Sequence, residues 1–66
     1  MDLIKIYHKD FHLILTIDEI LIINNALNEV CHALTLPDFS VRMGADRPEV
    51  LDLLTQINSL IKNMKF

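Results

Sequence analysis

The sequence TIDE at residues 16–19 restricts the fold more than any other feature, because it matches the capping box that begins a helix. In a capping box, the hydroxyl of Thr16 and the carboxylate of Glu19 each accept a hydrogen bond from a backbone N–H group that has no partner inside the helix. A helix that begins at residue 17 separates a short N-terminal segment from the rest of the chain. Each part is therefore interpreted separately.

The helix after the capping box is predicted to extend from residue 17 to residue 34. Its apolar residues recur at three- and four-residue spacings, which places them on one side of the helix. They are Ile20, Ile23, Leu27, Val30, Cys31 and Leu34. Pro37 ends the helix, because its ring removes a backbone donor and the residue before it avoids helical dihedral angles. This stripe is the predicted core side of the central helix.

Residues 3–16 contain two runs rich in β-branched and aromatic residues, which predict a β-hairpin with a two-residue turn at Lys9 and Asp10. This turn sets the register of the two strands. The predicted pairs are His8 with Phe11, Ile6 with Leu13 and Ile4 with Leu15. These six residues share one face, and five of them are strongly apolar. That face is predicted to lie against the core.

The opposite face of the hairpin is the candidate dimer face. It is half apolar and carries Leu3, Lys5, Tyr7, His12 and Ile14. A sheet face beside an uncovered edge can pair with a second copy, stack on it or receive another partner. Self-association is the favoured use, because so small a core needs support.

Two further segments complete the predicted fold. Residues 39–43, FSVRM, alternate apolar and polar and indicate a short third strand before a turn at Gly44, so the sheet has either two or three strands. Asp46 and Pro48 are typical of a helix start, and an apolar stripe follows. It consists of Val50, Leu53, Leu54, Ile57, Leu60 and Ile61. The expected fold class is α+β, one domain over residues 1–66, with an N-terminal β-hairpin and two helices on one face of an antiparallel sheet.

The composition favours a protein that needs a partner. The chain has 66 residues, of which 52% are hydrophobic and 23% charged. A body of this size is near the lower limit for folding without disulfides, metal or association, and it has little interior in which to hide apolar side chains. We expect part of the apolar surface to contact a second chain.

Charge and cysteine content exclude several other classes. The one cysteine, Cys31, forms no internal disulfide framework and points to a reducing compartment, so we expect a cytoplasmic protein with no secretory signal. No uncharged run approaches the roughly 20 residues of a membrane-spanning helix. The formal charge is −3, and the six basic side chains are scattered, which argues against direct binding of nucleic acid.

No group of residues indicates catalysis, a metal or a cofactor. His8 and His12 point to opposite faces of the predicted hairpin, which separates them as metal ligands. Cys31 lies on the apolar stripe, where a buried and unreactive thiol is expected. One glycine cannot form a glycine-rich phosphate loop. We therefore expect a protein that is not an enzyme and needs no cofactor.

The polar side of the first helix is the candidate partner-binding surface. It carries Asn25, Asn28 and His32, with Leu21 among them and Glu29 at the edge. Asparagine is a poor helix former, so these residues either keep the helix hydrated or form a recognition surface around an apolar anchor. The former interpretation includes a hydrogen bond from Asn24 to a neighbouring loop. Arg42 joins the candidate set, because its guanidinium can pair with Glu29 or with a partner carboxylate.

Three runs resemble a pattern found in very small bacterial proteins that accompany toxins as immunity proteins. They are ALNEVC at residues 26–31, FSVRMG at 39–44 and EVLDLL at 49–54, and the resemblance covers residues 20–54. Its less ordinary matches are Asn28, Glu29, Arg42 and Gly44. The resemblance implies neutralisation of a cognate toxin by direct binding, without cofactor or catalysis.

The leading hypothesis is thus a small, non-catalytic, protein-binding inhibitor of the immunity or antitoxin type. One alternative is a structural module, either a homodimer or a small subunit of a larger complex. Another is a phage-type inhibitor of a defence nuclease, which would differ from the first only in its target.

Overall fold

The computed structural model describes residues 1–33 and 35–64 of the chain. In this part, the β-hairpin of strands β1 (Asp2–Tyr7) and β2 (Asp10–Ile14) precedes helix α1 (Ile17–Asn28). A π-helical turn, η1 (Glu29–Ala33), extends α1, and helices α2 (Phe39–Met43) and α3 (Arg47–Lys62) follow. An antiparallel hairpin with helices confirms the α+β class.

The capping box predicted at the start of α1 is confirmed. The hydroxyl of Thr16 accepts a hydrogen bond from the backbone N–H of Glu19 at 3.1 Å, and the Glu19 carboxylate accepts one from the N–H of Thr16 at 2.9 Å. Asp46 is the N-cap of α3, as expected, with proline in the first turn. The Asp46 carboxylate accepts a hydrogen bond from the Ser40 hydroxyl instead of capping the helix.

The hairpin exists, but the predicted register is wrong by two residues. Tyr7 pairs with Asp10, so the turn residues are His8 and Lys9. His8 has a φ of 54°, in the left-handed region that tight hairpin turns require. The slip is even, and it therefore keeps Phe11 and Leu13 on the same face as Ile6.

A β-bulge between Leu3 and Lys5 changes the faces of β1. Regular pairing would have set Ile4 opposite Leu13, but the extra residue brings Leu3 to that position. Leu3 therefore leaves the face predicted for it and joins the face of Ile6. The bulge also interrupts the regular outer edge of β1.

The predicted third strand is wrong, because residues 39–43 form the helix α2. Left-handed residues bound this helix on both sides, with a φ of 54° at Asp38 and 76° at Gly44. The Gly44 N–H donates a hydrogen bond to the Ser40 carbonyl at 2.8 Å and closes the turn. Glycine adopts this conformation without strain, so Gly44 stops a helix where it was expected to start a turn after a strand.

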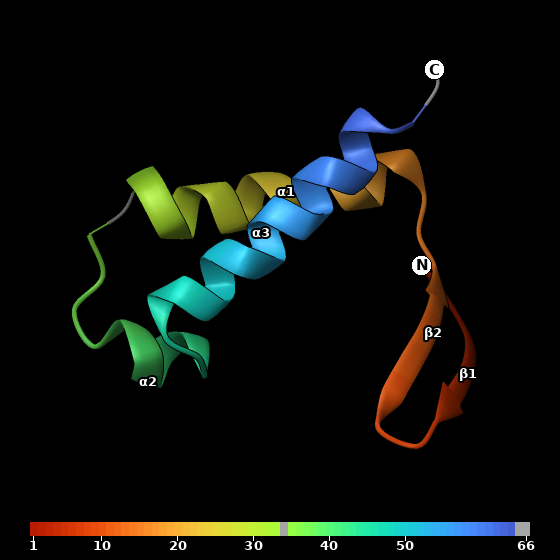
Figure 1. Cartoon of the computed structure of the whole chain (residues 1–66), viewed down its shortest axis with the longest axis horizontal. Coiled ribbons are helices and arrows are strands. Elements are labelled where there is room, and N and C mark those ends of the chain that lie inside the picture. Colours follow the sequence, from red (N-terminus) through yellow and green to blue (C-terminus); the bar gives the residue numbers. More distant parts are fainter. Residues whose placement is uncertain (34, 65–66) are drawn as a thin grey trace.

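The core lies between the helices. Helices α1 and α3 run side by side in opposite directions, with α2 near one end of the pair and the hairpin at the other (Figure 1). The buried apolar residues of the described chain are Cys31, Val50, Leu54 and Ile57. Cys31, Val50 and Leu54 form one cluster, and the half-buried residues packed against it are Leu27, Phe39, Met43, Ala45 and Leu51. Both predicted helical stripes contribute to it, and Leu34 lies outside the described residues.

The hairpin lies apart from this core. Every residue of β1 and β2 is exposed, and the ribbon extends away from the helices (Figure 1). The predicted packing of both helices on one face of the sheet is therefore not found in the described part of the chain. The helices pack on each other, and Leu15 and Thr16 connect them to the hairpin.

Candidate functional site

The hairpin has one apolar face and one polar face. Directly opposed residues of an antiparallel pair share a face, so Leu3 with Leu13 and Ile6 with Phe11 form the apolar one. We call these four residues the apolar hairpin face. All four are exposed, Phe11 at 65%. The other face carries Asp2, Lys5, Tyr7, Asp10, His12 and Ile14.

Of the five residues predicted to form the dimer face, all except Leu3 lie on the polar face. Its residues are exposed, and the Lys5 ammonium lies 5.6 Å from the centre of the Tyr7 ring. The Tyr7 ring also meets the ring of His8 edge-on, with centroids 4.2 Å apart. These contacts engage Lys5 and Tyr7 within the hairpin itself. The bulge adds Leu3 to the face that was expected to lie against the core, and this face is the more apolar of the two.

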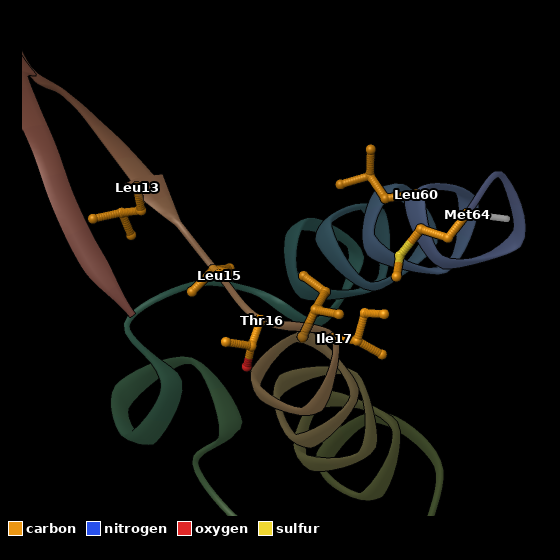
Figure 2. Close-up of a pocket in the computed structure, with 7 residues that line it drawn as sticks. Leu13, Leu15, Thr16, Ile17, Leu60 and Met64 are labelled. Carbon is orange, nitrogen blue, oxygen red and sulfur yellow. The ribbon is translucent and has the colours of Figure 1, made fainter. Parts of the chain in front are cut away.

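A hollow lies at the corner where the hairpin meets the helices. Its volume is about 310 Å³, and it is open to solvent. Figure 2 shows the side chains of Leu13 and Leu15 on the hairpin side and Leu60 and Met64 on the α3 side. The remaining lining comes from Thr16, Ile17 and Ile20. Because Leu13 belongs to both, the apolar hairpin face and this corner form one continuous apolar surface.

A second hollow of about 240 Å³ lies beside the start of α1, lined by Met1, Leu15, Glu19, Ile22 and Ile23. The Glu19 carboxylate accepts a hydrogen bond from the N-terminal ammonium of Met1 and forms an ion pair with it. This ammonium, followed by the Thr16 backbone N–H, lowers the pKa of Glu19. Glu19 therefore caps α1 and holds the start of β1.

The polar side of α1 is accessible, as predicted. Asn25, Asn28, Glu29 and His32 are exposed, whereas Leu21 is half-buried and not the exposed anchor that was expected. Arg42 is exposed on α2, and no ion pair joins it to Glu29 in the described part of the chain. We call Asn25 and Asn28 of α1, together with Glu29 and His32 of the η1 turn that extends it, the α1 polar face.

Sequence reasoning missed Ile22, the most exposed of the large apolar residues of α1. Ile22 is 67% exposed and lies one turn before Asn25. Its position off the apolar stripe was the available signal. Asn24 was expected to form a hydrogen bond with a neighbouring loop. Its side-chain oxygen Oδ1 is instead buried and has no hydrogen-bond partner among the described residues. Ile22, and not Leu21, is therefore the exposed apolar residue beside the polar face.

Among the described residues, the side chains that commonly bind metal ions lie apart. Cys31 is a buried free thiol, and His32 beside it is exposed. Within residues 1–33 and 35–64, no three His, Cys, Asp or Glu side chains lie close enough together to hold a metal ion. Over the same residues, no helix has the length and apolarity needed to cross a bilayer. The exposed surfaces, apolar on the hairpin and polar on α1, are the remaining candidate sites.

Comparison with known proteins returned no matching family model, curated protein or solved structure.

Proposed function

We propose that this protein is a small, non-catalytic inhibitor of the immunity or antitoxin type, which neutralises a toxic protein by binding it directly. The observation that carries the proposal is the number of apolar side chains that are exposed to solvent. The four residues of the apolar hairpin face are exposed, and Ile22 is exposed beside the α1 polar face. Contiguous uncovered apolar surface on a small domain is typical of protein–protein binding.

The α1 polar face is the proposed target-binding surface. Ile22 supplies an apolar anchor, and Asn25 and Asn28 supply amide groups that both donate and accept hydrogen bonds. Glu29 and His32 add polar groups on the following turn. Interfaces commonly surround an apolar anchor with such polar groups. The resemblance over residues 20–54 to immunity proteins supports a toxic protein as the target, and the buried free thiol of Cys31 supports the cytoplasm as the location.

The proposal is tested by co-purification from the source organism, with the affinity tag after Phe66. We expect one stoichiometric partner whose expression alone arrests growth, and we expect co-expression of this chain to restore growth. Recovery of a large housekeeping complex, or of a partner whose expression is harmless, would contradict the inhibitor and favour a subunit of an assembly.

Alanine variants then locate the surface. Ile22→Ala and Asn28→Ala are each expected to weaken target binding by about tenfold or more, which corresponds to about 1.4 kcal/mol. Gln56→Ala is the matched control, because Gln56 is an exposed amide on α3. Unchanged dissociation constants in both α1 variants would remove this face from the proposal.

A further inference from the structure

The chain exposes more surface than a protein of its mass normally does. Its accessible area is 5457 Å², whereas a folded monomer of 7.6 kDa is expected to expose about 4,300 Å². Its radius of gyration is 13.4 Å, against about 11 Å for a compact chain of this length. The excess area of roughly 1,200 Å² exceeds the roughly 800 Å² that each partner buries in a stable interface.

Many of the exposed large apolar side chains lie on the hairpin. The apolar hairpin face continues through Leu13 into the corner hollow, where Ile17 and Leu60 are also exposed. An isolated two-stranded hairpin is at best marginally stable in water. This hairpin therefore needs a cover whenever the protein is folded, and not only when a target is present.

We propose that the cover is a second copy of this chain. In the dimer, the apolar hairpin faces of the two copies pack against each other around a two-fold axis, and each corner hollow receives apolar side chains of the other copy. A second copy is the one partner that is present wherever the protein is made. The area available exceeds what such an interface needs.

The charges of the hairpin favour self-association. Asp2 and Asp10 are balanced by Lys5 and Lys9, so the hairpin is neutral and the net charge of −3 belongs to the rest of the chain. All four charges lie outside the apolar hairpin face, three of them on the polar face and Lys9 in the turn. The apolar hairpin faces of two copies can therefore meet without burying a charge, and the two hairpins themselves carry no net charge.

The strand edges favour a closed dimer over an open fibre. The bulge between Leu3 and Lys5 disrupts the edge of β1, and lysine on a strand edge discourages further strand addition. A two-fold interface uses the same patch on both copies and is complete at two. The dimer leaves the α1 polar face free, so it neither requires nor prevents the proposed inhibitor function.

The oligomeric state of the full chain tests the proposal. Light scattering after size exclusion is expected to give twice 7.6 kDa, and the melting temperature is expected to rise with protein concentration. Phe11→Lys would place a charge in the interface and is expected to raise the dimer dissociation constant by about 100-fold or more. Val41→Lys is the matched control, because Val41 is an exposed apolar residue on α2, and it should leave the dimer intact.

The outcomes separate this proposal from its rivals. A wild-type chain that is folded and monomeric at about 100 µM, far above the dissociation constant of a stable dimer, would overturn the dimer. A dimer that Phe11→Lys and the milder Ile6→Ser both leave intact would overturn the hairpin as its interface. If the hairpin instead binds a foreign target, Phe11→Lys would abolish target binding while the wild-type chain alone is monomeric. A dimer without any toxic partner would uphold this inference and refute the inhibitor.

Discussion

Arg47 donates a hydrogen bond from Nη1 to the backbone carbonyl oxygen of Cys31 at 2.6 Å. That carbonyl belongs to the π-helical turn η1, and Arg47 is the first residue of α3. The guanidinium carbon also lies 4.4 Å from the centre of the Phe39 ring, on α2. One side chain therefore joins three helical segments at the end of the molecule away from the hairpin.

Replacing Arg47 should destabilise the fold without affecting the hairpin. A hydrogen bond with a charged partner contributes about 1.5–3 kcal/mol, so Arg47→Met is expected to lower the free energy of unfolding by about 2 kcal/mol in urea titrations. Arg47→Lys keeps the charge but loses the planar contact with Phe39, and an intermediate loss is expected. Arg42→Met, an exposed arginine on α2, should change little. Equal losses in Arg42→Met and Arg47→Met would contradict the role of the Cys31 contact.

The capping hydroxyl of Thr16 should contribute measurably to stability. Thr16→Ala removes the acceptor for the Glu19 N–H and is expected to cost about 1 kcal/mol in the free energy of unfolding. Thr55→Ala is the matched control within α3, where the hydroxyl donates to the Leu51 carbonyl and alanine is the better helix former. Thermal unfolding should show a loss for the first variant only. A loss of similar size at Thr55 would indicate that the cap is not the cause.

Adjacent leucines on α3 should respond differently to truncation. Leu54 is 3% exposed in the central cluster, and Leu53 is 49% exposed. Leu54→Ala is expected to cost about 2–5 kcal/mol, because it removes buried contacts and leaves a cavity. Leu53→Ala should cost less than about 1 kcal/mol in the same denaturant titration. Similar costs at both positions would mean that the α1–α3 pairing does not form the core.

Stability should fall in acid through Glu19. The N-terminal ammonium, with the Thr16 N–H, lowers the pKa of Glu19 below its ordinary value of 4.5. A carboxylate with a lowered folded-state pKa stabilises the fold above its unfolded-state pKa, and this contribution disappears as the pH falls through the folded-state pKa. The melting temperature of wild type minus that of Glu19→Gln should therefore be positive near neutral pH and shrink below 4.5. A difference that does not vary with pH would contradict the ion pair.

Local signals in the sequence correctly located the two long helices. The capping box at Thr16 and the N-cap at Asp46 depend only on neighbouring residues, and the apolar stripes follow from helical spacing. The register of the hairpin failed because it depends on which residue adopts a left-handed φ. Lys9-Asp10 looked like the turn, but His8 takes the left-handed position.

Predictions for the short segment 39–43 and for the covering of the hairpin faces were weaker. Five alternating residues at 39–43 fit one strand or little more than one helical turn, and Gly44 and Asp38 decided for a helix through their backbone angles. The period of the hairpin correctly grouped Ile6 with Phe11 and Leu13 as apolar. Periodicity shows which side chains share a face but not what covers that face. The sequence correctly predicted that the α1 polar face is accessible. It named Leu21 as the exposed apolar residue beside this face, whereas Ile22 is the exposed one.

The separation of the hairpin from the helical core, across the two-residue connection at Leu15 and Thr16, has a consequence for the rate of folding. The contacts between α1 and α3 form within one chain, at a rate that does not depend on dilution, whereas the proposed cover of the hairpin requires an encounter between chains. We therefore expect biphasic refolding, with a fast step independent of protein concentration and a second step that accelerates with it. The concentration of the protein in the cell would then determine how long the apolar face of each newly made hairpin remains exposed to solvent and to other proteins.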